Sequence, residues 1–524
     1  MTPLETVSSA ASADSVRRAG PRLRPRGLPA SERLAQASSV LYLAPVLVLA
    51  AVLRVWQVNE TGFNSDEAVY SGQAAAIAND SELTEFFPVF RAHPLLLQTI
   101  LSLGFRLELG AGFERITVAA MGVATVLLVY ELGRLLYGRQ AGLVAALLMA
   151  LMPYHVVVTR QVLLDGPMTF FATLTLVLLV RFVISGRPVW LYATGAAMGL
   201  TFLAKETSLV LLGAIYAFLA LTPTLAVRLR ELAISVGVMA LVIAPFPLSM
   251  MLAGRTGTGE SYLTWQLFRR PNHDWFFYPD TVPEAIGPLV LLAAAIGLWL
   301  LRREASWRET LLLSWIVVPV VFFQLWPVKG FQYLLPVAPA VAVLAGRALS
   351  RLPAPGRRGL QALAVAVVAV SLLVAAWDRV DGSRPDSFLA GSGGLPGGRE
   401  TGEWIDDHAP AGAAFMTIGP SMANLVQYYG RRRAYGLSVS PNPLNRNPSY
   451  EPLVNPDRAI RDSELQYLIW DAFSAGRSGR FSDRLLAYAD RYDGRVVHTE
   501  VLPARTRRGE SVDRPAIVVF EVRP

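Results

Sequence analysis

The chain contains no cysteine, which excludes disulfide bonds, thiol nucleophiles and zinc or iron–sulfur sites with cysteine ligands. Histidine is also scarce. The five histidines form neither an HExxH motif nor a close pair, so we do not expect a histidine-rich metal site. They are His93, His155, His273, His408 and His498.

Charge is scarce as well. Charged residues make up 17% of the 524 residues, whereas a soluble domain carries about 25%. Hydrophobic residues make up 53%, and the mean hydropathy is +0.39. So few charges cannot supply the polar surface that a soluble protein of this size needs. The composition excludes a soluble enzyme, a disordered chain and a fibrous repeat, and it predicts a membrane protein.

Lysine is nearly absent: of the 48 basic residues, only Lys205 and Lys329 are lysines. The codon usage of a GC-rich genome would explain this bias. Lysine and arginine are nevertheless not equivalent at a phosphate site, so both lysines are candidates for one. The net charge of +8 favours contact with anionic headgroups or phosphates. Much of the arginine lies in short loops between apolar runs, which argues against a nucleic-acid partner.

Eleven apolar runs are candidates for crossing a bilayer. No small-residue cleavage site follows the first run, so we interpret it as an uncleaved span. The runs are 38–56, 113–133, 140–158, 166–184, 189–204, 207–225, 231–252, 285–301, 309–326, 331–349 and 358–377. We therefore predict a disordered, basic cytoplasmic tail at 1–37 and a transmembrane module at 38–379.

The positions of the arginines predict how these spans are oriented in the membrane. With the N-terminus in the cytoplasm, every inner connection is basic, as the positive-inside rule requires. The odd number of spans then places the C-terminus outside the plasma (inner) membrane. Residues 94–109 are also apolar, but counting them as a span would move the arginines outside. We therefore predict a helix on the outer membrane surface, with Gln98, Ser102 and Arg106 on one face.

The composition changes after Trp377. Residues 380–400 are rich in glycine, serine and proline and are typical of a linker. Short strands alternate with helices in residues 401–524, which predicts a small extracytoplasmic α/β domain. The expected helices are 403–408, 422–429 and 481–492, and the expected strands are 413–419, 465–471, 496–502 and 516–522.

Acidic residues at two places in the chain are candidates for catalysis. Asp66 and Glu67 are adjacent in the first outer loop, a few residues before Tyr70, and a solvated loop pair is the alternative interpretation. Asp165 and Arg160 flank the outer end of the third span. An acid at a membrane boundary usually faces a partner or a cavity. Asp165 could also cap the next helix, and the two roles are compatible.

Basic and aromatic residues gather on the same predicted side. Lys205 and Lys329 both fall at outer helix ends, where snorkelling lysines are the alternative. The loop 253–284 contains His273 among arginines and aromatics. Such a mixture suits sugar and phosphate contact, although aromatics at an interface are often membrane anchors.

Several motifs in residues 40–350 resemble those of the GT-C glycosyltransferases. The resemblance is to the group of protein O-mannosyltransferases and lipid A aminoarabinose transferases, which is glycosyltransferase family 39-like. It rests on the order and spacing of these pieces: Asp66-Glu67, His93-Pro94, Gly122 with Tyr130-Glu-Leu-Gly133-Arg134, Pro153 with Arg160 and Asp165, Gly199-Leu200 with Lys205, and Tyr333-Leu-Leu-Pro336.

The resemblance implies a GT-C type, all-α membrane module of about eleven helices. It also implies an undecaprenyl- or decaprenyl-phosphate sugar donor, an acceptor reached from the outer face and inversion at the anomeric carbon. By position, Asp66 would be the general base, Glu67 would orient the acceptor or the base, and Asp165 would be a second catalytic acid. Lys205 and Lys329 fall where such enzymes place cations near the lipid phosphate. We expect substrate contacts from Tyr70, His93, Arg160, Lys205, His273, Lys329 and Tyr333.

The sequence leaves several points open. No clear DxD motif is present, so we expect no cofactor, although a divalent cation is possible. The acceptor could be a glycan, a lipid or a protein. A polytopic transporter or lipid-carrier flippase is the alternative function, but such proteins usually show repeats and charges at mid-membrane depth. A non-catalytic membrane subunit that recruits partners is a third.

Overall fold

The computed structural model describes residues 30–89, 93–269, 271–301, 306–351, 358–381, 395–505 and 511–524. The chain divides into two compact units, Met1–Leu43 and Ala44–Pro524. Everything below concerns the second unit. Of the predicted tail 1–37, residues 1–29 lie outside the described residues, and α1 begins at Ala30, before the predicted start at 38. Most of the predicted linker, residues 382–394, also lies outside them.

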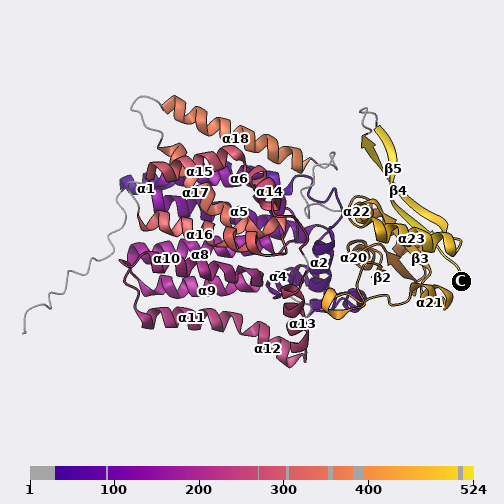
Figure 1. Ribbon diagram of the computed structural model, residues 1–524. Coiled ribbons are helices and arrows are strands. Elements are labelled where there is room, and N and C mark those ends of the chain that lie inside the picture. Colours follow the sequence, from indigo (N-terminus) through magenta and orange to yellow (C-terminus); the bar gives the residue numbers. More distant parts are fainter. Residues whose placement is uncertain are drawn as a thin grey trace, which may run out of the picture. The chain divides into compact units, whose positions relative to one another are not determined.

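Helices make up residues 44–380 (Figure 1). The apolar helices include α8, α9 and α11, which pack in sequence, and α15, which packs on α17. The helices are α1 (Ala30–Val55), α2 (Ser65–Ile77), α3 (Ser81–Phe86), α4 (Leu96–Arg106), α5 (Phe113–Tyr137), α6 (Arg139–Leu151), α7 (Pro153–Thr159), α8 (Asp165–Ser185), α9 (Pro188–Ala204), η1 (Glu206–Leu209), α10 (Val210–Leu221), α11 (Leu229–Ile243), α12 (Pro245–Leu252), α13 (Thr256–Leu267), α14 (Phe277–Ile286), α15 (Pro288–Leu301), α16 (Trp307–Leu325), η2 (Phe331–Val337), α17 (Ala338–Ser350) and α18 (Arg358–Val380).

Each of the eleven predicted apolar runs coincides with a helix or with two consecutive helices. Within the described part of the chain, six helices are long and apolar enough to cross a membrane, or eight if each bent pair is one span. Three shorter apolar helices, Tyr42–Val55, Pro188–Ala204 and Glu206–Leu221, account for the other runs. The fold is therefore that of a helical membrane protein, and the count of eleven spans stays a prediction.

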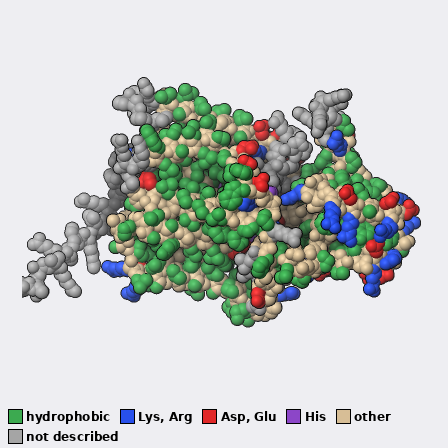
Figure 2. Space-filling model, viewed as in Figure 1, with side chains coloured by type: hydrophobic (Ala, Val, Ile, Leu, Met, Phe, Trp, Pro, Cys, Tyr) green, Lys and Arg blue, Asp and Glu red, His purple; other side chains and the backbone are tan. Residues whose placement is uncertain are grey.

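The outward faces of these helices are apolar (Figure 2). Leu241 and Leu252 on α11 and α12 are 74% and 82% exposed. Contiguous apolar surface of this kind is rare on soluble proteins, whereas a bilayer solvates it well. The Lys and Arg side chains gather instead over the C-terminal residues, beside the sheet.

The segment 94–109 forms the short helix α4, whose 11 residues could not span a bilayer. Part of its predicted polar face does not point to solvent. Gln98 and Ser102 are buried, and the Gln98 amide donates to the Gln73 side chain of α2 at 3.1 Å. Gln98 and Ser102 are thus covered because α4 packs this part of the predicted face against α2, whereas Arg106 is exposed, and the location at the membrane surface stays a prediction.

The C-terminal region is an α/β domain with the sheet order β2-β1-β3-β5-β4. Strands β1, β2 and β3 are parallel, and β5 is antiparallel to β3 and β4. All the predicted strands are confirmed, and β2 is added. Its elements are α19 (Gly398–His408), β1 (Ala414–Thr417), α20 (Pro420–Tyr429), β2 (Arg433–Gly436), η4 (Pro443–Asn445), α21 (Pro456–Arg461), β3 (Tyr467–Asp471), α22 (Ala472–Arg477), α23 (Gly479–Arg491), β4 (Arg495–Arg505) and β5 (Ser511–Glu521).

One hydrophobic core joins this domain to the first loop of the helical part. Phe63 and Leu97 belong to the same buried cluster as Phe415 and Met422. The Phe63 amide also donates to the Tyr429 hydroxyl at 2.9 Å. This shared core packs α20 of the α/β domain against α2, at whose start the candidate acids lie.

Candidate active site

Helix α2 starts at the acidic pair, and its cap explains the backbone there. Asn64 is the N-cap, and its side-chain oxygen accepts hydrogen bonds from the Asp66 and Glu67 amides at 2.9 and 3.0 Å. Glu67 completes a capping box by accepting from the Asn64 amide at 3.0 Å. The cap places Asp66 and Glu67 in the first helical turn, on different sides of the helix.

Glu67 is fully buried and engaged by Arg115 of α5. Both carboxylate oxygens lie 2.7 Å from guanidinium nitrogens, and the Val162 amide donates to one of them at 3.0 Å. Arg115 also donates to three backbone carbonyls of the loop before α2. Glu67 therefore anchors the loop and α2, and it does not line the cavity described next.

A cavity of about 490 Å³ opens beside Asp66. Its wall combines the start of α2, the α9–η1 junction, α13, the loop before η2 and loops of the α/β domain. Seven of the ten predicted site residues line it, namely Asp66, Tyr70, His93, Lys205, His273, Lys329 and Tyr333. The other three, Glu67, Arg160 and Asp165, do not.

Asp66 is the carboxylate that remains accessible. Its side chain is exposed to the cavity, while its neighbour Glu67 is enclosed. Desolvation by the surrounding protein raises the pKa of Asp66 above its ordinary value, and the positive charges of Lys205, His93 and Arg269 oppose that rise. Asp66 can therefore accept a proton from a group bound in the cavity.

Lys205 is held by a carboxylate. Its ammonium lies 2.8 Å from both oxygens of Asp165, and both side chains are buried. The ammonium also lies 4.7 Å from the centre of the Tyr333 ring. Asp165 thus stands behind Lys205 rather than in the cavity, and it neutralises that cation.

Within the described part of the chain, the Lys329 ammonium contacts backbone carbonyls and aromatic rings and forms no ion pair. Its ammonium donates to the carbonyls of Gln324 at 3.1 Å and Trp326 at 3.3 Å. The Asn272 side chain pairs with the Lys329 backbone through two hydrogen bonds of 2.8 Å. This arrangement positions a buried ammonium at the cavity wall without neutralising it.

His93 and Glu206 form a second charged unit in the wall. The His93 Nδ1 atom lies 2.9 Å from a Glu206 carboxylate oxygen. The rings of Tyr70 and Tyr262 contact the imidazole edge-on at centroid distances of 6.1 and 5.5 Å. Burial raises the pKa of Tyr70 well above its ordinary value, so its hydroxyl stays protonated.

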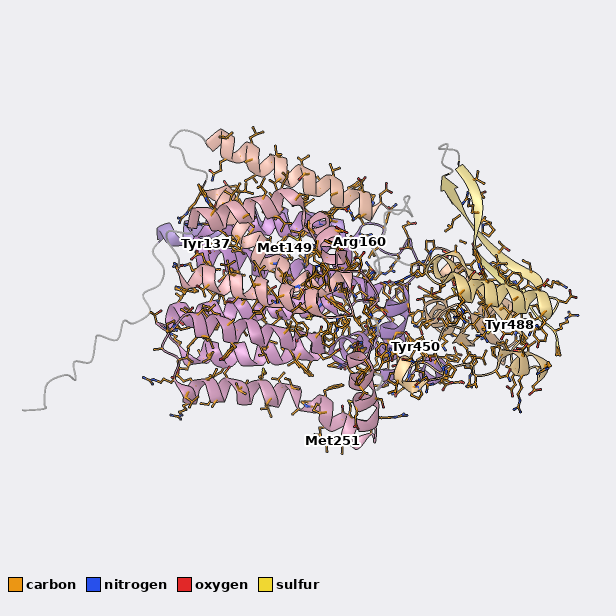
Figure 3. The ribbon with its side chains drawn as sticks, in the orientation of Figure 1. Tyr137, Met149, Arg160, Met251, Tyr450 and Tyr488 are labelled. Carbon is orange, nitrogen blue, oxygen red and sulfur yellow. The ribbon has the colours of Figure 1, made fainter. Side chains whose placement is uncertain are left out.

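Arg160 has a structural task elsewhere. Its guanidinium donates to the carbonyls of Leu53 and Trp56 at 2.8 and 2.7 Å, near the end of α1. Figure 3 shows Arg160 among the helices and Tyr450, a residue of the cavity wall, in the α/β domain. The predicted substrate role of Arg160 finds no support in this position, because Arg160 does not line the cavity and two of its nitrogens donate to backbone carbonyls.

Several cavity residues carried no sequence signal strong enough to select them. Arg446 and Arg477 come from the α/β domain, in which the sequence shows no recognisable motif. Arg269, which the sequence showed only as part of a basic, aromatic loop, stacks on Trp265. In the described residues these three arginines and Lys329 form no ion pair with a carboxylate. The cavity is therefore strongly positive around Asp66.

Comparison with known proteins gives the same fold. The family model described as dolichyl-phosphate-mannose-protein mannosyltransferase matches residues 92–250. The chain superimposes on ArnT from Cupriavidus metallidurans with a TM-score of 0.67 and 18% identity, over 93% of this chain and 98% of that one. The resemblance to the GT-C glycosyltransferases is confirmed.

Two further relatives extend the comparison. AglB, the oligosaccharyltransferase of Archaeoglobus fulgidus, superimposes with a TM-score of 0.58 and 13% identity over 92% of this chain and 75% of that one. YycA of Bacillus subtilis (strain 168), named as a mannosyltransferase, is 36% identical over 111 residues, which are 21% of this chain and 16% of that protein. The chain thus matches only a small part of YycA's length.

Proposed function

We propose that this protein is a membrane glycosyltransferase that transfers a sugar from a polyprenyl-phosphate donor to an acceptor. The proposal rests on the cavity, in which Asp66 is exposed beside Lys329 and three arginines that form no ion pair with a carboxylate in the described residues. Sugar transfer from a lipid phosphate needs a base for the acceptor hydroxyl and positive charge at the departing phosphate. This cavity contains both.

Asp66 is the proposed general base. It takes the proton from the acceptor hydroxyl as that oxygen bonds to the anomeric carbon, while the bond from this carbon to the phosphate oxygen breaks. A single displacement of this kind inverts the anomeric configuration. Glu67 acts as a positioning residue, since its pair with Arg115 fixes the turn that presents Asp66.

Lys329 and Arg269 are the proposed phosphate ligands. A cation already neutralised by a carboxylate offers little charge to a phosphate, so Lys205 serves mainly to hold Asp165 and the wall at Tyr333. Electrostatic contacts that stabilise developing charge contribute about 10²–10³ in rate each. The Tyr70 and His93 side chains line the same cavity as Asp66 and are proposed to orient the sugar.

The relatives support the donor class. One ArnT structure of 17% identity and TM-score 0.67 is bound to undecaprenyl phosphate, and AglB is in complex with dolichol-phosphate. The matched family segment 92–250 contains His93 and Lys205 of the cavity. We also propose a plasma-membrane location with a cytoplasmic N-terminus, the cavity and the α/β domain on the outer side, and transfer without a required metal. EDTA treatment of the purified enzyme tests the last point.

Replacement of Asp66 by Asn tests the proposal. The variant D66N keeps the size and the cap of the residue but removes its basicity, so sugar transfer should fall by about 10²–10⁴. Transfer is measured in nanodiscs from a panel of undecaprenyl-phosphate sugars. The control is E60Q, an exposed residue of the same loop that does not line the cavity. Full transfer by D66N would contradict the assignment.

A further inference from the structure

A second, smaller cavity of about 140 Å³ lies beside the first. It is formed by the end of α3 with the residues that follow it, by α20 and β2, and by the loop 449–451. None of the ten residues predicted from sequence lines it. Its lining residues are Glu85, Phe86, Pro88, Pro420, Ala423, Asn424, Gln427, Arg433, Ala434, Tyr435, Gly436, Val439, Ser449, Tyr450 and Glu451.

The two cavities share part of their walls. Pro420, Val439 and Tyr450 line both. The Asn424 side chain of the second cavity also donates to the Ser65 hydroxyl at 2.8 Å, and Ser65 directly precedes the proposed base Asp66. A molecule in the second cavity is therefore next to the turn that carries the reacting carboxylate.

The two cavities differ in charge. The first contains Lys329 and three arginines without carboxylate partners in the described residues. The second contains two glutamates, Glu85 and Glu451, and a single arginine, which is already paired with Glu85. A phosphate would be attracted to the first cavity and repelled by the second. An occupant of the second cavity should therefore carry no phosphate or other anionic group.

The polar groups of the second cavity suit hydroxyl groups. Asn424, Gln427 and Ser449 offer donors and acceptors together, and Glu451 is an exposed acceptor. A sugar hydroxyl both donates and accepts, so it can satisfy such a mixture. The rings of Phe86, Tyr435 and Tyr450 add apolar surface for the C–H face of a sugar ring.

A bound peptide strand fits this cavity less well. Strand β2 lies at the edge of the sheet, where an extended peptide could add by backbone pairing. However, the Gln427 side chain already donates to the Ala434 carbonyl of β2 at 3.1 Å, and α20 packs on that strand. Side chains therefore occupy the edge at the cavity.

We propose that the second cavity binds an uncharged carbohydrate, which serves as the acceptor. Its role as acceptor site rests on the proposed glycosyl transfer, whereas carbohydrate binding itself does not. The arrangement assigns one substrate to each cavity: the lipid phosphate to the cationic one, which Asp66 lines, and a neutral glycan to the other, whose Asn424 bonds the residue before Asp66.

Binding measured on the full-length protein in nanodiscs tests this proposal. The probes are neutral oligosaccharides of mannose, arabinose, galactose and glucose, a Ser/Thr-rich peptide, and undecaprenyl phosphate. Variant E451Q removes the negative charge of the Glu451 side chain but keeps its shape. Variant S449W places a large ring in the cavity. The control L444A changes an exposed residue nearby that lines neither cavity.

We expect saturable binding of at least one neutral oligosaccharide. E451Q should raise its Kd about tenfold, since a hydrogen bond to a charged group is lost. S449W should abolish sugar binding, while both variants and L444A bind undecaprenyl phosphate like the wild type. Oligosaccharide binding that S449W leaves unchanged, or peptide binding that S449W blocks, would overturn the proposal. Failure of the wild type to bind undecaprenyl phosphate would instead count against the proposed donor, and the sugar results would still decide this cavity.

Discussion

Lys205 and Lys329 line the same cavity, yet the protein surrounds them differently. Lys205 makes two 2.8 Å contacts with Asp165, whereas Lys329 is held by the carbonyls of Gln324 and Trp326. Both ammonium groups are buried. The first lysine thus forms a closed ion pair, and the second keeps its charge available. We therefore propose separate roles for two residues that are equivalent in the sequence, one structural and one for binding an anion.

The largest expected effect is a loss of stability when the ion pair of Lys205 and Asp165 is broken. Variant K205M leaves the Asp165 carboxylate buried without its cation, which should reduce the free energy of unfolding by about 3–5 kcal/mol. The double variant K205M/D165L removes both charges and should recover most of that loss. Denaturant unfolding in detergent, followed by tryptophan fluorescence, measures both. Equal stability of the single variant and the wild type would show that the pair is not a stabilising unit.

Lys329 should behave in the opposite way. Variant K329M removes a charge that has no carboxylate partner, so we expect sugar transfer to fall by about 10²–10³. Stability should change much less than in K205M, because no carboxylate is stranded. Variant K329R retains the charge and should recover part of the transfer rate. A large loss of stability together with normal transfer in the folded fraction would reverse the roles assigned to the two lysines.

The dependence of sugar transfer on pH tests how the cations of the cavity act on Asp66. A general base must be deprotonated, so activity is lost as the pH falls through its pKa. Desolvation raises the pKa of Asp66, and this acidic limb should therefore lie above that of an ordinary aspartate. Variant R269Q removes a cation that opposes the rise and should move the limb to still higher pH. The control R255Q, an exposed arginine outside the cavity, should leave it in place.

The smallest effect is expected at the exposed rim. Arg477 lines the cavity but is solvent-exposed, and its guanidinium lies over the Phe473 ring. Salt screens such a charge strongly, so R477Q should change transfer by about threefold or less at physiological ionic strength. Rates measured at low and high salt separate this screened contribution from that of the buried Lys329. A loss as large as that of K329M would make Arg477 a direct phosphate ligand.

The sequence predicted most of the helical part because spanning apolar runs are a strong signal. It missed β2, whose four residues Arg433–Gly436 are too short and polar to resemble a strand. Periodicity also predicted that Gln98 and Ser102 share a face of α4, but it could not show that α2 covers them.

The sequence predicted only part of the candidate site, again because it does not show which elements pack together. Residue type and motif order selected Asp66 and both lysines, which do meet in one cavity. The resemblance gave Asp66 and Glu67 different roles, but the sequence could not show that Glu67 is buried against Arg115, 48 positions away in the chain. The arginines of the α/β domain were missed since only the tertiary fold brings Arg446 and Arg477 to the cavity.

Titration of undecaprenyl phosphate onto the wild type, D66N and K329M tests the central claim most directly. If the cavity is a donor site with Lys329 as phosphate ligand and Asp66 as base, D66N binds the lipid as well as the wild type does. K329M then binds it at least tenfold more weakly. Equal affinities of the wild type and K329M, or the absence of saturable binding to the wild type, would contradict the account.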